Sequence, residues 1–182
     1  MIVAVLNEGP KETRVAITPS SVKHYIQLGF DVLCETNAGS ASGFTDLAYQ
    51  NAGAQITTQR QALLAQTNIL LAINEPLPND LSGLPKNALI ITHVDNDPNA
   101  ALIQWCGKQQ LSLFSMNLIP RISRAQGLDS LSSQANLAGY RGVLEGVHHF
   151  NRAVPMMMTA AGMIQPAKIL ILGAGVAGLQ AI

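Results

Sequence analysis

The sequence has few cysteines, few aromatic residues and few charges. Two of its 182 residues are cysteine, and Cys34 and Cys106 each lie in an apolar stretch without CxxC spacing or a flanking histidine. Such cysteines are typical of buried free thiols in a reducing compartment, not of a disulfide or a metal site. No apolar run approaches the roughly 20 residues that span a bilayer, and the N-terminus lacks the basic segment of a signal peptide. We therefore expect a soluble, cytoplasmic chain.

The small charge content also limits the partners. Charged residues make up 12% of the chain, and its 11 basic residues are balanced by 11 acidic ones. Nucleic acid is not an expected partner, because phosphate binding normally requires a basic face. Hydrophobic residues account for 48% of the sequence, and no low-complexity tract interrupts them. This composition is typical of a folded α/β protein with one domain and part of another.

Short runs of Val, Ile and Leu predict buried parallel strands, with helical patterns between them. The runs are Ile2–Leu6, Val32–Cys34, Ile69–Ile73, Leu89–Ile91 and Leu111–Phe114. Thr18 and Pro19 predict the start of a helix that Gly29 ends, and Thr45 predicts the cap of a short helix through Ala52. Residues 100–106 predict another helix, ending at Gly107. Alternation of strands and helices predicts a doubly wound, Rossmann- or flavodoxin-like sheet.

The second half of the chain has a different pattern. A polar loop at residues 117–130 precedes a long helical pattern from Leu131 to Val154, which Pro155 should end. A helix of that length would reach roughly 35 Å and can bridge two domains. A last strand is expected at Lys168–Leu172. We therefore predict an N-terminal α/β domain at residues 1–130, an interdomain helix at 131–154, and the start of a second Rossmann domain at 155–182.

A glycine-rich motif follows the last predicted strand. Gly173, Gly175 and Gly178 match GxGxxG, with Val176 opening a helical pattern. In dinucleotide-binding folds the first glycine permits a tight turn, the second lets the backbone approach a pyrophosphate, and the third allows close helix packing. The acidic residue that normally follows about 20 positions later lies beyond the sequence, which ends at Ile182. We expect the second domain to be incomplete and its NAD affinity to be low.

A polar stretch precedes the long helix. Residues 120–134 contain two arginines, two glutamines, an aspartate and four serines. Such a concentration of polar side chains between two domains suits a ligand site. A purely structural interpretation is equally open on composition: Asp129 or Ser132 caps the helix, and the arginines are solvated.

Four segments together resemble one family. The stretch 120–141, the segment Pro-Met-Met-Met-Thr-Ala-Ala-Gly at 155–162, the end at 173–182, and the opening at 12–19 are similar to the NAD(H)-binding component of the proton-translocating NAD(P) transhydrogenases. The opening is shared with the alanine dehydrogenases. The similarity extends over the whole chain, and Arg121 through Tyr140 is its most specific part.

The resemblance implies roles for individual residues. Arg121 and Ser132 would bind the nicotinamide end of NAD(H), Asp129 would hold its carboxamide, and Gln126 would reach toward NADP(H) on a partner component. Arg121, Gln126 and Asp129 are thus the candidate catalytic residues. The implied cofactor-binding set is Arg121, Gln126, Gly127, Leu128, Asp129, Ser132, Gly173, Gly175, Val176 and Gly178.

The resemblance also implies partners and a location. Membrane-spanning and NADP-binding components would couple hydride transfer from NADH to NADP+ to proton translocation. The chain would then be peripheral to the inner membrane through these partners. We also expect a homodimer or a swapped oligomer.

Alanine dehydrogenase is the competing activity. Its chemistry moves protons as well as a hydride and needs acid/base groups, yet Asn74 stands where that family has a lysine. Arg14 can in principle hold a carboxylate, and His93 falls where the dehydrogenases have a histidine, although we favour a satisfied polar residue at a strand end. Hydride transfer between two nicotinamides requires only approach and orientation.

Two further features have simpler interpretations. Glu145, His148 and His149 resemble metal-ligand spacing but lack further ligands, so a solvated helix surface is expected. Met156–Met158 are expected in a packed interdomain connection.

A non-catalytic alternative remains. The chain would fold through residue 130 and associate through exposed apolar surface at 155–182, because Ile169–Leu172 need a partner.

Overall fold

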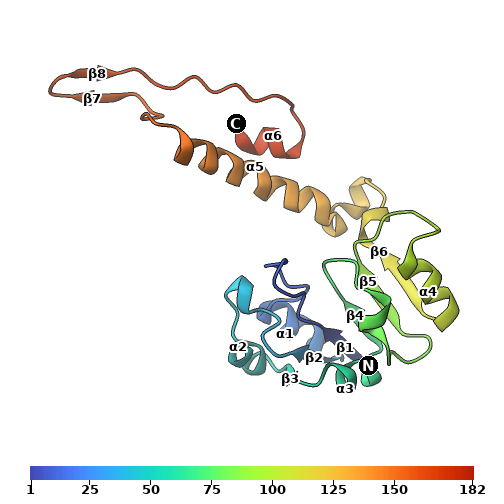
Figure 1. Ribbon diagram of the computed structural model, residues 1–182. Helices are drawn as coiled ribbons and strands as arrows, with labels where there is room; N and C mark the ends of the chain where they lie inside the picture. Colours follow the sequence, from blue (N-terminus) through green and yellow to red (C-terminus); the bar gives the residue numbers. More distant parts are fainter. The chain divides into compact units, whose positions relative to one another are not determined.

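The computed structural model describes residues 1–182, which form two compact units, Met1–Ile119 and Pro120–Ile182 (Figure 1). The predicted domain boundary at residue 130 stays a prediction. No helix of the chain has both the length and the apolar composition needed to span a membrane.

The first unit is built on a parallel sheet of six strands, in the order β3-β2-β1-β4-β5-β6. The strands are β1 (Ile2–Val5), β2 (Asp31–Glu35), β3 (Gln55–Thr57), β4 (Ile69–Leu71), β5 (Leu89–Thr92) and β6 (Ser112–Ser115). Its helices are α1 (Pro19–Gln27), α2 (Asp46–Asn51), α3 (Arg60–Gln66) and α4 (Ala101–Gln109), with 3-10 turns η1 (Ser40–Ser42), η2 (Pro78–Leu81) and η3 (Met116–Leu118). The α/β fold expected from the sequence is confirmed.

Both faces of this sheet are buried. Val3 and Val5 contribute to one apolar cluster, whereas Ala4 and Leu6 contribute to a second cluster. Successive side chains of a strand point to opposite faces, so the two clusters lie on the two sides of the sheet. This arrangement explains why the strands read as continuous apolar runs and not as alternating ones.

The helix caps predicted from the sequence are present. The side chains of Thr18 and Thr45 accept hydrogen bonds from the backbone N–H groups of Ser21 and Ala48, at the starts of α1 and α2. Gly29 follows the end of α1 with φ of +86°, a conformation that glycine adopts without steric cost. Local chemistry therefore sets these boundaries.

Two elements of this unit were missed in the sequence, and one expected helix end was wrong. The strand β3 and the helix α3 were not predicted, since the three-residue edge strand is too short to show periodicity. The helix α4 does not stop at Gly107 but continues to Gln109, and Gln110 ends it in the left-handed conformation with φ of +58°. Apolar packing of Leu102 and Cys106 keeps that helix intact.

The second unit contains a 3-10 turn η4 (Ser123–Leu128), the helix α5 (Ser130–His149), an antiparallel hairpin of β7 (Met157–Thr159) and β8 (Gly162–Ile164), and the helix α6 (Val176–Ala181). In Figure 1, α6 lies beside α5, and the hairpin lies past the C-terminal end of α5. Gly139 is the buried residue of α5, so the long helix is otherwise partly or fully open to solvent.

Three expectations for the second unit were also wrong. The helix α5 ends at His149, before Pro155, because Phe150 already has extended backbone angles. Residues 168–172 have no strand partner, so they form no β-ladder. Met156–Met158 are exposed, and two of them belong to the hairpin instead of a packed connection.

Tyr49 provides a test of the first unit's core. Its side chain is 1% exposed, and its hydroxyl donates a 2.8 Å hydrogen bond to the Ile17 carbonyl oxygen. We expect Tyr49→Phe to lower the free energy of unfolding by about 1 kcal/mol, because a buried hydrogen bond is lost. Denaturant titration measures the change. Tyr140→Phe, at a side chain 56% exposed, should have little effect; equal effects of the two changes would contradict the packing described.

Candidate functional site

The polar turn before α5 is organised around Asp129. This residue is the N-cap of α5: its Oδ1 accepts from the Ser132 backbone N–H at 2.9 Å, and its Oδ2 accepts from the Ser132 hydroxyl at 2.6 Å. The Ser133 hydroxyl donates to the Asp129 carbonyl oxygen at 3.2 Å. The capping role left open by the sequence is therefore observed. It fixes the carboxylate at one position without using all of its acceptor lone pairs.

The same contacts keep Asp129 ionised. The pKa of this carboxyl group is lowered, first by the Ser132 hydroxyl, then by the Ser132 backbone N–H, with a smaller contribution from the positive charge of Arg121. A charged carboxylate accepts hydrogen bonds but donates none. Asp129 thus suits an N–H donor of a ligand and is not suited to general acid catalysis near neutral pH.

The remaining residues predicted around this turn have different degrees of exposure. Asp129 and Ser132 are half-buried, whereas Arg121, Gln126, Gly127 and Leu128 are exposed. Ala125, in the middle of η4, is buried and anchors the turn. The turn therefore presents the guanidinium, amide and carboxylate groups from a fixed backbone.

The glycine-rich turn has the local geometry that its motif predicts. Gly173 has φ of +111°, where only glycine is unstrained. A Cβ on Gly178 would overlap the Gly173 carbonyl oxygen, whereas a Cβ on Gly175 would meet nothing within 4 Å. The first and third glycines are therefore required by the turn itself. The second is not, which leaves its backbone open to close approach by a ligand.

The polar turn around Asp129 and the glycine-rich turn both adjoin the helix α5. A Cβ on Gly139 would overlap the Ala177 carbonyl oxygen, so the backbones of α5 and α6 touch at this point. Gly139 comes ten residues after Asp129 in the same helix, or about 15 Å along its axis at 1.5 Å per residue. One rigid helix therefore carries the polar turn at its start and the glycine-rich turn at its side. Gly139 was not singled out from the sequence.

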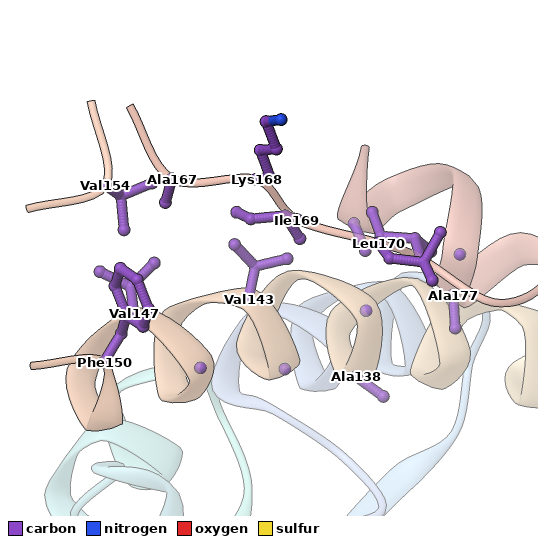
Figure 2. Close-up of a pocket in the computed structure, with 16 residues that line it drawn as sticks. Ala138, Val143, Val147, Phe150, Val154, Ala167, Lys168, Ile169, Leu170 and Ala177 are labelled. Carbon is purple, nitrogen blue, oxygen red and sulfur yellow. The ribbon is translucent and has the colours of Figure 1, made fainter. Parts of the chain in front are cut away.

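A cavity of about 650 Å³ lies further along α5. It is bounded by the second half of the helix, by residues 167–171 and by α6. Figure 2 shows Val143 and Ile169 pointing toward one another across it, while the Lys168 side chain points away from the helix. Apart from Lys168 the lining is apolar and offers no acid, base or metal ligand, so it suits packing and not chemistry. We call this surface the α5 groove.

A second polar cluster lies in the first unit, where strands β1, β4 and β5 end. Glu8 accepts from the backbone N–H groups of Ile73 at 2.6 Å and Asn74 at 3.2 Å. His93 Nδ1 lies 2.9 Å from the Ile73 carbonyl oxygen. The order of strands reverses direction between β1 and β4, and the carboxyl edge at such a point is where open α/β sheets bind ligands.

Arg14 and Glu12 form an ion pair in this cluster. Arg14 Nε donates to Glu12 Oε1 at 2.8 Å, and Nη2 donates to Oε2 at 2.7 Å. Asn74 Nδ2 donates to Glu12 Oε2 at 3.2 Å. The arginine side chain, chiefly by this hydrogen bonding, lowers the pKa of Glu12 to about 2 from its ordinary 4.5, although burial opposes the shift.

Other polar side chains of the sequence take part in ordinary contacts. Glu145 forms an ion pair with Arg141 on the surface of α5, and its Oε2 lies 3.8 Å from His149 Nε2. No group of three or more His, Cys, Asp or Glu side chains gathers at a possible metal position. Cys34 and Cys106 are buried and form no disulfide, and burial raises the pKa of the Cys34 thiol to about 12.

Comparison with known proteins decides the family. The N-terminal domain of the alanine dehydrogenase/PNT family matches residues 4–138, and the C-terminal domain of that family matches residues 142–182. The chain belongs to the alanine dehydrogenase/PNT family. The family resemblance predicted from the sequence is thereby confirmed.

Individual relatives agree with this assignment. An NAD(P) transhydrogenase subunit alpha polypeptide of Rhodospirillum rubrum is 42% identical over 178 residues, which cover 95% of this chain and 46% of that protein. The crystal structure of transhydrogenase from Sinorhizobium meliloti has a TM-score of 0.92 and 43% identity, and the match covers 100% of this chain and 54% of that one. A solved L-alanine dehydrogenase has a TM-score of 0.83 and 27% identity, covering 100% and 50%. The chain spans about half the length of these relatives.

Within the alanine dehydrogenase/PNT family, the similarity is greater on the transhydrogenase side, at 43% identity against 27%. The Glu12–Arg14 pair and Asn74 form one connected cluster in the first unit. The Asp129 turn and the glycine-rich turn both belong to the second unit. Each unit thus carries one group of polar candidate residues, and the NAD(H)-binding residues predicted from the sequence all belong to the second unit.

The contact between α5 and α6 is testable with two glycines of one helix. Alanine normally stabilises a helix interior by about 1 kcal/mol over glycine, and Gly142→Ala has room for its methyl group. Gly139→Ala should instead displace α6, because its methyl group meets the Ala177 backbone. Amide hydrogen exchange should be faster at residues 176–181 in Gly139→Ala only. Equal protection in both variants would show that the two backbones do not touch.

The low pKa of Glu12 predicts a dependence of stability on pH. A carboxyl group whose folded pKa is depressed contributes stability above its unfolded pKa and loses it as pH falls. Denaturant titrations should therefore show stability declining between pH about 4.5 and about 2. Glu12→Gln should flatten this part of the profile, and Glu75→Gln, at an exposed glutamate, should not. An unchanged profile in Glu12→Gln would contradict the ion pair.

Proposed function

We propose that this chain is the NAD(H)-binding part of a proton-translocating NAD(P) transhydrogenase. The observation that supports this function most directly is the ionised Asp129 carboxylate, held by Ser132 at the start of the helix that also carries the glycine-rich turn. The names of the more similar relatives agree with it. The NADP(H)-binding and membrane-spanning components would be separate partners, and the chain would lie on the cytoplasmic side of the inner membrane through them.

The residues present fit a nicotinamide dinucleotide. Asp129 accepts hydrogen bonds, which suits the N–H donors of a carboxamide, and the Ser132 hydroxyl fixes its orientation. Arg121 would hold the same end of the cofactor by its guanidinium group. Gly127 and Leu128 expose the backbone of η4 beside these side chains. Gly175, which has open space beside its Cα, leaves room for the pyrophosphate next to Val176.

Bound NAD(H) would supply the hydride. The protein has to position the ring and exclude water, because transfer between two nicotinamides needs no protein acid or base. The set of Arg121, Gln126, Asp129 and Ser132 offers guanidinium, amide, carboxylate and hydroxyl groups and no general acid. Gln126 is exposed on η4, which suits contact with the second nucleotide on a partner component. The site composition therefore matches orientation and not proton transfer.

Alanine dehydrogenase activity is the less favoured alternative. The carboxylate of its substrate would need Arg14. The guanidinium group of Arg14, however, already donates hydrogen bonds to both oxygens of the Glu12 carboxylate. The amide of Asn74 donates to Glu12 and carries no charge. Proton transfer to an amino-acid substrate needs a titratable group, and this cluster offers His93, whose Nδ1 faces a backbone carbonyl.

Association through residues 155–182 is a second candidate function. Leu170 and Leu172 are 82% and 89% exposed. Large exposed apolar patches mark interaction surfaces in folded proteins. This candidate is compatible with NAD(H) binding, because the exposed leucines precede the glycine-rich turn and leave the Asp129 turn free.

The proposed cofactor site is tested with two adjacent serines. NADH is titrated calorimetrically into this chain and into a chimera that continues after Ile182 with the rest of the Rhodospirillum rubrum relative. Ser132→Ala should weaken binding about tenfold or more, because the carboxylate loses the charge-assisted hydrogen bond that orients it. Ser133→Ala is the matched control, since its hydroxyl contacts only the Asp129 backbone. Absence of binding in both proteins would overturn the proposal.

The same chimera distinguishes binding from transfer. When it is mixed with the NADP(H)-binding component of a relative, Gln126→Ala should slow hydride transfer more than it weakens NADH binding. Asp129→Asn should weaken NADH affinity itself, because an amide can no longer present two acceptor oxygens. Transfer to pyruvate and ammonia in place of NADP+ would identify an alanine dehydrogenase instead.

A further inference from the structure

The two halves of the proposed cofactor site lie on one face of α5. Gly139, where α5 touches α6, comes seven residues after Ser132, and helical residues seven apart lie on the same side, two turns apart. Burial agrees with this face: Ser132 and Ala135 are half-buried and Gly139 is buried, whereas residues 133, 134 and 136–138 are exposed. The hydroxyl that orients Asp129 therefore belongs to the side of α5 that α6 packs on.

The glycine-rich turn lies on the Asp129 side of the contact between α5 and α6. In Figure 1, α6 runs beside α5 and ends at the C-terminus of the chain, toward the hairpin, so its first residue is directed toward the start of α5. Ala177, which touches Gly139, is the second residue of α6. Gly175 is thus only two residues away from the contact. An elongated ligand can therefore follow this face of α5 from one turn to the other.

The contact at Gly139 sets the separation of the two turns. A Cβ on Gly139 would lie 2.8 Å from the carbonyl carbon and 2.9 Å from the Cα of Ala177, well below the 3.4–4 Å of an ordinary van der Waals contact. These neighbours are backbone atoms, which cannot rotate aside as the end of a side chain can. A side chain at Gly139 would therefore move α6, and the glycine-rich turn with it, away from α5.

The shape of each turn is set within the turn itself. The glycine-rich turn depends on the positive φ of Gly173 and on the close approach of Gly178 to the Gly173 carbonyl oxygen. The polar turn is closed by the hydrogen bonds between Asp129 and Ser132. Neither set of contacts includes Gly139. What Gly139 determines is the position of one turn relative to the other.

We propose that Gly139 is a positioning residue for the cofactor: it sets the separation at which one NAD(H) molecule reaches the Asp129 turn and the glycine-rich turn together. The inference rests on the proposed function, because it takes these turns as the two ends of one dinucleotide site. A linked ligand gains about 10²–10⁴ in affinity over its halves, and only where the geometry lets both halves bind at once. Gly139 acts on this gain through the position of α6.

The separate halves of the cofactor test this role. NADH, reduced nicotinamide mononucleotide and ADP-ribose are each titrated into this chain and into its chimera with the Rhodospirillum rubrum relative, by calorimetry or, for weak binding, by ligand-observed nuclear magnetic resonance. Gly139→Ala should weaken NADH binding about tenfold or more and change the affinity for each half by less than about twofold, because the turns keep their shape but lose their spacing. Gly142→Ala, on the same helix with room for its methyl group, is the matched control and should change none of the three affinities.

The possible results separate this inference from the proposed function. If the unmodified proteins bind NADH and Gly139→Ala binds it equally well, the spacing of the turns does not matter and the inference fails. Equal losses of affinity for NADH and for ADP-ribose would show that Gly139 supports the fold of the glycine-rich turn, which would also overturn the inference. If the unmodified proteins bind no NADH, the proposed function fails, and this inference with it.

Discussion

The second unit depends on one backbone contact, between Gly139 of α5 and Ala177 of α6. Any side chain at Gly139 would separate the two helices. This contact places the glycine-rich turn against the helix that begins at Asp129, so the two groups of candidate ligands share one rigid element. A second close approach, of Gly178 to the Gly173 carbonyl oxygen, shapes the turn itself. Glycine at these positions is required by sterics and not by flexibility.

The Asp129 side chain shows how one group can have both a structural and a functional role. Its hydrogen bonds to Ser132 cap α5 and at the same time keep the carboxylate charged. A capping aspartate is common, and on its own it says little about function. Its place beside Arg121 and Gln126, in a member of the alanine dehydrogenase/PNT family, is what makes a nicotinamide site the better interpretation.

The first unit contributes a contrasting polar centre. Glu8 binds backbone N–H groups after β4, and Glu12 holds Arg14 and Asn74 at the carboxyl edge of the sheet. These side chains satisfy one another, so the cluster works as a brace between the loop after β1 and the loop after β4. In an amino-acid dehydrogenase a substrate would have to compete with that brace.

The sequence by itself determined the parallel sheet, the caps at Thr18 and Thr45, and the turn at Gly173, because apolar runs, capping side chains and positive φ angles are local properties. It also located the polar stretch around Asp129. Tertiary structure decided the rest. The edge strand β3 forms only by pairing with β2, and α4 passes Gly107 because its apolar face is packed. The close approach of Gly139 to Ala177 and the pairing of β7 with β8 depend on contacts that no single-residue pattern records.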